Sequence, residues 1–362
     1  MRRISVQYAQ PGMVLASDVY DMYGNVLLYQ GVRLTLDNIG TLGRMGGGEI
    51  FIHDRRVDDV PVTTLIPSRL AGEATRQLRT LFEALRASMK GRPEEPVYAS
   101  KMEQAVFSMV QQLFPVAIGE VHATGCFSLA DYDYVHPVQV TELALLMGRR
   151  LGYDQDQLTR LGLVAVLQNV GYLALSKGVM DEPTTLSSIE MHEVRQHSQY
   201  GYQIIRDFTR VSNDVAQGIL QHHERWDGSG YPRGAKGETI SLDARLIGIA
   251  DTYYALVSRR PHRAATKPHE AVEFIMAYSG QYFDPKLVTL FTKVIQIYPT
   301  GVMVSLNTGE SGIVVDSKSG LGGRPIVRIC YDANQMEWAK PFDIDLSEGE
   351  HQHRLVTEVV EY

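Results

Sequence analysis

The sequence predicts a mostly α-helical protein with a small β-rich module at each end. Apolar residues recur at helical spacing from about residue 98 to residue 297. On both sides of this region, short apolar runs alternate with glycine- and proline-rich turns, which is typical of small antiparallel sheets. We therefore expect four parts. They are an N-terminal module (1–62), an amphipathic linker helix with a breaker (63–97), a helical domain (98–297) and a C-terminal appendage (298–362).

Composition excludes several classes of protein. The net charge of −7 argues against a general binder of nucleic-acid polymers, because phosphate backbones require a basic surface. The two cysteines, Cys126 and Cys330, lie far apart and form no CxxC motif, which suits a reducing cytosol. No stretch approaches the roughly 20 apolar residues of a membrane helix, and no apolar run follows the first residues as in a signal peptide. We expect a cytoplasmic protein without a membrane span.

The N-terminal module is predicted from short strands and turns. A short helix over 35–45 fits between the last two strands, and the module contains no cluster of titratable groups. We expect it to have a structural or regulatory role. The apolar runs are 14–15, 19–20, 26–28 and 50–52.

One amphipathic helix is predicted over 68–90, with Ser68 as its N-cap. Its apolar residues recur at spacings of three and four, and its outer face is charged. Such a helix either packs on its own domain or pairs with a second copy, which would make a homodimer. The apolar residues are Leu70, Ala74, Leu78, Leu81, Phe82, Leu85 and Met89.

The central region predicts eight helices, and the C-terminal appendage predicts short strands at 302–304, 313–315 and 326–329. We infer no functional site in the appendage. The predicted helices are 99–115, 136–151, 156–166, 187–208, 212–223, 241–257, 267–278 and 284–296.

The stretch 222–232, HHERWDGSGYP, holds more chemistry than any other part of the chain. His222 and His223 follow a predicted helix, and Glu224 precedes a turn with two glycines and a proline. Adjacent helical positions differ by about 100° in direction, so the two histidines cannot share the middle of one buried face. Both can reach a single centre at the end of the helix.

This stretch closely resembles HHExxDGxGYP, the signature of the HD-GYP family, which is a branch of the HD metallohydrolases. Family members with intact sites are metal-dependent phosphodiesterases that open cyclic di-GMP. The resemblance covers the helical region best and implies an HD-domain helical bundle. The segments before and after it also resemble the modules that accompany HD-GYP domains.

The resemblance implies a set of metal ligands in family order. His136 matches the first histidine, His197 matches a later one, and the signature pair follows. Asp251, in the string IADTYYAL, matches the late aspartate. The implied ligands are His136, His197, His222, His223 and Asp251.

One element departs from the family pattern. Where the family has Leu-His-Asp-Ile-Gly-Lys, residues 167–172 read LQNVGY, so Gln168, Asn169 and Tyr172 stand at the histidine, aspartate and lysine positions. The apolar frame and Gly171 remain, so the helix and its turn are expected to persist. A neutral carboxamide is a poor bridge between two dications, because it lacks the negative charge that holds them close.

The family pattern divides the remaining ligands into two groups. His197, His222 and His223 would hold one ion, and three imidazoles are enough for that. His136 and Asp251 would bind the other ion, and only the neutral amides of Gln168 and Asn169 would remain to complete its ligands. We therefore expect at most one divalent metal (Fe, Mn, Zn or Ni), at the three-histidine position, and no full dimetal centre.

The nucleotide-binding residues are also implied by the resemblance. Arg260 and Arg263 follow Asp251 in a stretch similar to the family's RPYR, and arginine binds phosphate in a bidentate manner. The signature turn would shape the wall of the same pocket, and Tyr231 could stack or donate a hydrogen bond. The turn residues are Gly228, Gly230, Tyr231 and Pro232.

Three functions follow from these patterns. The first expectation is a degenerate HD-GYP protein of cyclic di-GMP signalling that binds the nucleotide or a protein partner with little or no hydrolysis. The alternative is an active metal-dependent phosphodiesterase that releases pGpG or GMP. A third is a protein-interaction scaffold without nucleotide binding. Gln168 and Asn169 leave the question of enzyme activity open.

Overall fold

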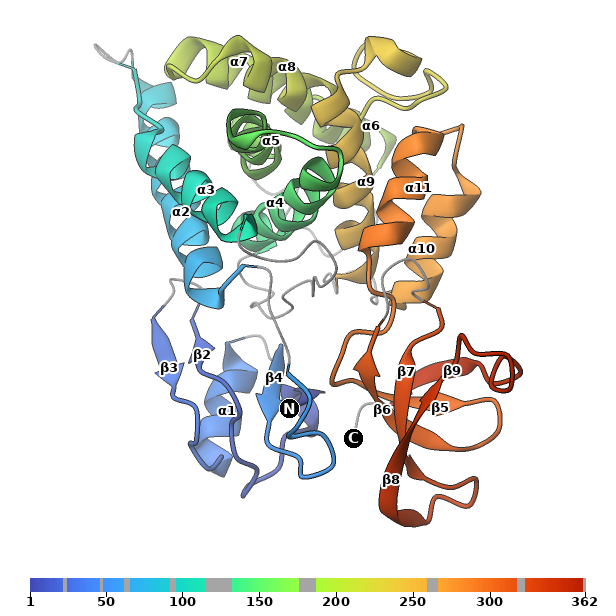
Figure 1. Ribbon diagram of the computed structural model, residues 1–362. Helices are drawn as coiled ribbons and strands as arrows, with labels where there is room; N and C mark the ends of the chain where they lie inside the picture. Colours follow the sequence, from blue (N-terminus) through green and yellow to red (C-terminus); the bar gives the residue numbers. More distant parts are fainter. Residues whose placement is uncertain are drawn as a thin grey trace. The chain divides into compact units, whose positions relative to one another are not determined.

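The computed structural model describes residues 1–21, 25–45, 48–61, 66–91, 96–114, 132–175, 187–258, 266–317 and 323–360. The described residues divide into two compact units (Figure 1). The β unit combines Met1–Ser68 with Thr292–Tyr362, and the helical unit lies between them in sequence. The predicted fold class is confirmed, with a helical region and small antiparallel sheets. The four predicted boundaries stay predictions.

Helix α5 is central to the helical unit and packs against α3, α4, α8 and α9 (Figure 1). Its residues from Leu161 to Leu167 are all buried. The helices are α2 (Ser68–Lys90), α3 (Ser100–Leu113), α4 (Tyr132–Arg150), α5 (Gln155–Leu167), α6 (Ser188–Arg195), α7 (His197–Phe208), α8 (Asn213–Gln221), α9 (Leu242–Val257), α10 (Pro268–Ala277) and α11 (Pro285–Val294), with 3-10 turns η3 (Val170–Ala174) and η4 (Gly237–Thr239).

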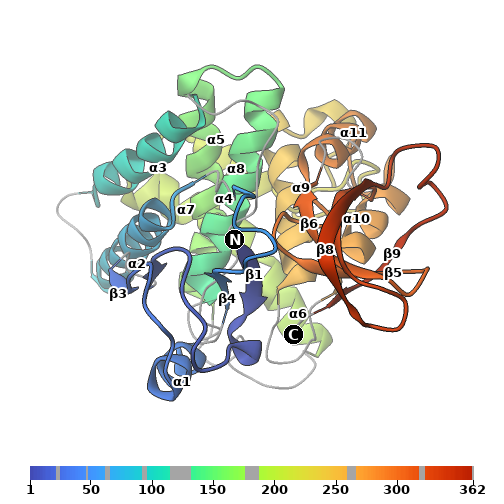
Figure 2. The same ribbon diagram turned by 60° about the horizontal axis from the view of Figure 1, so that its bottom comes forward.

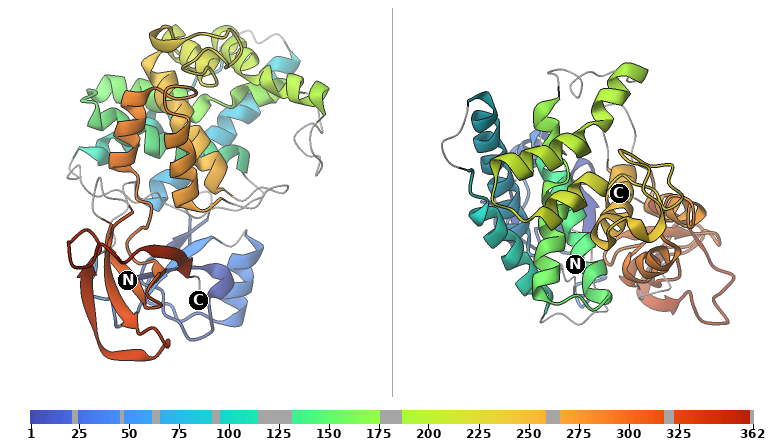
Figure 3. Two further views of the ribbon diagram at one scale, coloured as in Figure 1. Left: turned by 90° about the vertical axis from the view of Figure 1, so that its right-hand side faces the viewer. Right: turned by 90° about the horizontal axis from the view of Figure 1, so that it is seen from above.

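The single helix predicted over 187–208 is wrong, because the chain forms two helices, α6 and α7, that meet at Gln196. The Nδ1 atom of His197 lies 2.6 Å from the carbonyl oxygen of Val194, which a continuous helix would bond to the amide of Ser198. The amide of Gln196 instead bonds Glu193, three residues back. The break points the His197 ring inward. Helices α7 and α8 lie side by side beyond it (Figure 3).

Helix α2 buries its apolar face within the chain. Leu78, Leu81 and Leu85 are at most 5% exposed, and the ring of Phe82 contacts Tyr134 of α4. This arrangement corresponds to the first of the two alternatives, packing on its own domain. Among the described residues, no helix has the length and apolar character needed to cross a membrane.

The β unit contains three antiparallel sheets among its described residues. β1 pairs with β4, β2 pairs with β3, and a five-stranded sheet has the order β8-β7-β6-β5-β9. Figure 2 shows β5 beside β9, the last strand of the chain. The elements are β1 (Arg2–Ser5), β2 (Val19–Tyr20), β3 (Val26–Leu28), α1 (Leu36–Arg44), β4 (Glu49–Ile52), β5 (Met303–Leu306), β6 (Ser311–Asp316), β7 (Ile326–Tyr331), β8 (Glu337–Asp345) and β9 (Val356–Val360), with a 3-10 turn η1 (Val6–Tyr8).

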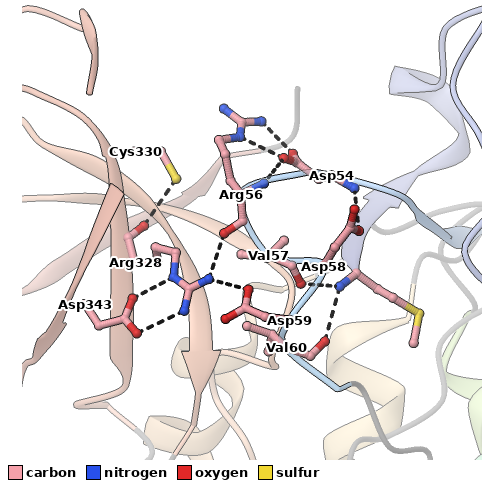
Figure 4. A network of polar contacts seen from close by, with 10 residues as sticks. Asp54, Arg56, Val57, Asp58, Asp59, Val60, Arg328, Cys330 and Asp343 are labelled. Atoms are coloured by element: carbon pink, nitrogen blue, oxygen red, sulfur yellow. Dashed lines mark hydrogen bonds and ion pairs between the residues drawn. The ribbon is translucent and has the colours of Figure 1, made fainter. Parts of the chain in front are cut away.

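A polar network ties the segment after β4 to the five-stranded sheet (Figure 4). Arg328 of β7 donates to Asp59 at 2.5 Å, to Asp343 at 2.7 Å and to the carbonyl oxygen of Arg56 at 2.8 Å. Apolar contacts lie under this network, where Val57 packs into a buried cluster with Ile313 of β6. The two ends of the sequence therefore build one body.

Candidate metal and nucleotide site

Three imidazoles meet in the helical unit. His197 begins α7, and His222 and His223 follow the last residue of α8. One ring nitrogen from each lies within 4.8 Å of the others. His197 and His222 are buried, and His223 is partly exposed. The structure therefore brings together the three histidines that the sequence assigns to one metal, and their role as ligands stays a prediction.

Backbone hydrogen bonds orient two of these rings. Nδ1 of His197 donates to the carbonyl oxygen of Val194, and Nδ1 of His222 donates to that of Ile219, both at 2.6 Å, because a carbonyl oxygen can only accept. The lone pairs are thus on the Nε2 atoms, which face each other at 3.2 Å. Metal-binding histidines are commonly fixed by such a bond from the second nitrogen.

The three imidazoles are held neutral. Burial lowers the pKa of His197 to about 3, and the neighbouring charge of His222 acts in the same direction. Burial also lowers the pKa of His222, and it places the pKa of His223 well below its ordinary value together with the charges of His222 and His197. Two facing lone pairs on neutral rings repel each other unless a cation lies between them. The donor set therefore fits a divalent metal.

Close backbone packing positions His197. A Cβ atom on Gly171, in η3, would lie 1.7 Å from the carbonyl oxygen of His197 and 2.6 Å from the amide nitrogen of Gly201. Only glycine allows η3 to approach α7 so closely. Gly171, two residues after Asn169, is therefore required by the packing of η3 against His197.

His136 and Asp251 form a second group. Nε2 of His136 lies 2.8 Å from Oδ1 of Asp251, and Nδ1 of His136 lies 3.1 Å from the hydroxyl of Tyr132. His136 is 2% exposed, and the Asp251 side chain is 15% exposed. The amide nitrogen of Gln168 also donates to Asp251 Oδ1, at 3.3 Å.

Asp251 is ionised in this setting. Burial favours its neutral form, but the hydrogen bond and charge of His136 outweigh burial and lower the pKa of Asp251 below the ordinary value. The carboxylate thus interacts electrostatically with both groups of histidines. Its charge also opposes the lowering of the pKa values of His197, His222 and His223.

Two of the three residues that depart from the family pattern contact the candidate ligands: Gln168 bonds Asp251, and Tyr172 lies beside His197. Gln168 is fully buried, and its Oε1 atom has no hydrogen-bond partner within the described ranges. Asn169 is 6% exposed. The ring of Tyr172 lies 4.5 Å from that of His197, between centroids. A neutral amide therefore contacts Asp251, and a phenol ring lies beside His197.

The signature turn folds back over the histidines. The ring centroid of Tyr231 lies 4.8 Å from that of His223. Gly228 has a φ of 87°, and a Cβ on Gly230 would lie 2.3 Å from the amide of Arg225. The peptide bond before Pro232 is cis. Tyr231 thus lies beside the metal-site histidines, and the role of the turn in shaping a ligand pocket stays a prediction.

The helical unit and the C-terminal sheet both match known protein families. The model of the HD domain family matches residues 101–287, more than half of the chain, and the model of a KOW domain associated with HD domain matches residues 303–354. A cyclic di-GMP phosphodiesterase of Pseudomonas aeruginosa is 32% identical over 226 residues, covering 62% of this chain and 54% of that protein. The chain belongs to the HD-GYP family.

Other relatives of this HD-GYP chain are also named as cyclic dinucleotide phosphodiesterases. The cyclic di-GMP phosphodiesterase response regulator RpfG of Xanthomonas campestris is 34% identical, over 41% of this chain and 40% of that protein. A 3'3'-cGAMP-specific phosphodiesterase of Vibrio cholerae is 31% identical, over 46% and 36%. The chain thus spans about half or less of these relatives. An HDG"Y"P protein from Bdellovibrio bacteriovorus shares the fold, with a TM-score of 0.50 and 16% identity over 80% of this chain and 97% of that one.

Not every predicted site residue of the HD-GYP chain can be placed. Arg260 and Arg263, the predicted phosphate contacts, lie outside the described residues. The structure also shows three residues near the site to which the sequence analysis assigned no role. Tyr132 contacts His136, Glu224 holds the signature turn, and Arg195 lies over Tyr231. Of these, only Glu224 had a sequence signal, as the acid of the HHE motif.

Glu224 stabilises the HD-GYP signature turn. Its carboxylate is 7% exposed and accepts hydrogen bonds from the amides of Arg233 at 2.8 Å and Ala235 at 2.9 Å. We expect Glu224→Ala to lower the free energy of unfolding by about 3 kcal/mol, because it removes two charge-assisted hydrogen bonds that a buried carboxylate accepts from the turn backbone. Denaturant unfolding measures this. The control Asp227→Asn alters an exposed carboxylate that binds Ser229 and should change stability far less.

Proposed function

We propose that this chain binds cyclic di-GMP, or a protein partner in cyclic di-GMP signalling, with little or no hydrolysis. The relatives named as cyclic di-GMP phosphodiesterases support the nucleotide, and the three-histidine centre supports a metal-assisted site. The observation that carries the proposal is the pair of adjacent buried amides, Gln168 and Asn169, of which Gln168 donates to Asp251.

The proposal includes one divalent metal per chain. His197, His222 and His223 would hold it, and when bound it would neutralise phosphate charge and act as a Lewis acid. The chain's own part is to fix the imidazoles as neutral acceptors through Val194 and Ile219. Iron, manganese, zinc and nickel all suit an imidazole donor set.

A second metal is disfavoured by the donors near Asp251. The Gln168 amide directs an N–H group at Asp251, and a donor N–H cannot ligate a cation. Reversing the amide would place two oxygens against each other. Asn169 offers no negative charge to bridge ions that lie about 3.5–4 Å apart in such centres. Hydrolysis that depends on two metals is therefore expected to be lost.

The test is a hydrolysis assay on the full chain, loaded anaerobically with Fe(II) or Mn(II) and incubated with cyclic di-GMP. We expect chromatography to recover the nucleotide intact and elemental analysis to find one metal per chain. Release of pGpG or GMP that His223→Ala abolishes would establish the alternative of an active phosphodiesterase. A stoichiometry near two would contradict the one-metal proposal.

An affinity titration on the same sample separates the remaining functions. Saturable binding of intact cyclic di-GMP, weakened by Arg260→Ala, supports the nucleotide-binding function. A protein that neither binds nor hydrolyses the nucleotide would be a scaffold, acting through the β unit or α2. The proposal of nucleotide binding would then be wrong.

A further inference from the structure

Arg195 is an exposed cation at the edge of the three-histidine site. It is the last residue of α6, two positions before His197, and its guanidinium carbon lies 5.6 Å from the centre of the Tyr231 ring. In the part of the chain that the structure describes, no carboxylate forms an ion pair with it. Its charge is therefore available to an anion from solution.

Tyr231 connects this cation to the metal ligands. The same ring lies 4.8 Å from the His223 ring and 6.4 Å from the His197 ring, between centroids. Arg195 and Asp251 both act on the Tyr231 hydroxyl, whose pKa burial and the Asp251 charge raise, while the charge of Arg195 opposes them. The guanidinium, the phenol ring and the imidazoles thus follow one another along a single wall.

Other arginines of the helical unit are already engaged. Arg245 pairs with Asp284 at 2.7 Å, and Arg160 pairs with Asp243 at 2.7 Å. Arg225 lies over the Tyr282 ring at 4.4 Å, and burial lowers its pKa. Arg195 differs from these three, because it combines an exposed guanidinium, no acidic partner among the described residues and a place beside the metal ligands.

We propose that Arg195, supported by Tyr231, binds a phosphate group of the nucleotide. A cyclic dinucleotide carries two separate phosphates, and one metal at the three histidines would lie against one of them, which leaves the charge of the other. An arginine at the edge of the site would bind the remaining charge through two parallel N–H···O bonds. Tyr172 beside His197 is neutral and does not supply this charge. This inference rests on the proposed function.

The test measures the affinity of the full, metal-loaded chain for cyclic di-GMP at low and high salt. We expect Arg195→Gln to weaken binding about 10- to 100-fold, as the loss of charge-assisted hydrogen bonds predicts. The salt dependence of binding should fall as well, because an exposed charge pair is screened by ions. Arg195→Lys keeps the charge but not the planar pair of N–H donors, and should recover part of the affinity for cyclic di-GMP. Metal content should stay unchanged in both variants.

The matched control is Arg206→Gln. Arg206 is also an exposed helical arginine, with its guanidinium carbon 5.5 Å from the Tyr202 ring, but it pairs with Asp207 at 2.7 Å. It lies nine residues beyond His197 on α7, about 13 Å along the axis. Its substitution should leave affinity within about twofold, the scatter expected of an exposed ion pair.

The outcomes distinguish the two proposals. If the unaltered chain binds cyclic di-GMP and Arg195→Gln binds equally well, the role of Arg195 is wrong while the proposed function stands. If Arg195→Gln and Arg206→Gln weaken binding equally, the effect is general electrostatics and the phosphate contact is wrong. If the unaltered chain does not bind the nucleotide at all, the phosphate contact of Arg195 and the nucleotide-binding part of the proposed function are both wrong.

Discussion

Gly171→Ala is expected to destabilise the helical unit by about 3 kcal/mol or more, the upper range for overpacking a well-packed interior. The added Cβ would lie 1.7 Å from a backbone oxygen of His197, and no side chain can move aside to relieve that contact. Relief requires η3 to separate from α7. Denaturant unfolding followed by circular dichroism measures the loss.

The same substitution should also weaken metal binding. Moving the backbone of His197 displaces its Nε2 atom from the facing Nε2 of His222, and the side chains that hold a metal tolerate little displacement. Gly43→Ala in α1 is the control, because nothing lies within 4 Å of its added Cβ and alanine favours a helix by up to about 1 kcal/mol. If Gly171→Ala were as stable as the unaltered chain, the close approach of η3 and α7 would not exist in solution.

Gln168→His combined with Asn169→Asp is expected to raise the metal content from one to two per chain. Turnover of cyclic di-GMP should appear at least about 100-fold above that of the unaltered chain, since even outer partners of metal ligands change activity by 10- to 100-fold. The imidazole supplies a strong ligand, and the carboxylate supplies the charge that bridges two dications. Leu167 and Val170, which flank the pair, are fully buried, so the frame that would hold the new ligands is present.

Metal dependence provides a second measurement on this variant. An added carboxylate at Asn169 would be buried next to Gln168, whose amide bonds the ionised Asp251, so without metal the two like charges are expected to oppose folding. Chelation should therefore lower the melting temperature of the double variant more than that of the unaltered chain. Asn169→Asp alone is the control, because it adds the charge without the imidazole. One metal and no turnover in the double variant would show that the defect lies elsewhere.

Local patterns were sufficient for most helices and for the histidine centre. The helix over 68–90 and the turn after Gln221 follow from apolar spacing and from glycine and proline positions. The break at Gln196 could not be predicted, because it depends on the His197 ring bonding a carbonyl of its own segment. Strand β8 lacks an apolar alternation, since all but three of its nine residues are exposed.

Contacts between segments that are distant in the sequence could not be predicted from local patterns. Arg195 carries no local signal, because an exposed helical arginine is ordinary until the fold places Tyr231 beside it. The close approach at Gly171 likewise depends on His197, which lies in another element. The resemblance to the HD-GYP family predicts which residues share the site, and their neighbours depend on the fold.

The shared β unit has a consequence for synthesis of the protein. Arg56 bonds the Tyr331 hydroxyl across 275 positions, and Arg328 bonds Asp59 across 269. At about 5–20 residues per second, a ribosome needs on the order of 10–60 s to make the intervening chain. The segment after β4 therefore lacks its packing partners, and Val57 stays exposed to solvent, until β6 and β7 emerge from the ribosome. The helical unit, complete before then, can fold first while the β unit closes last.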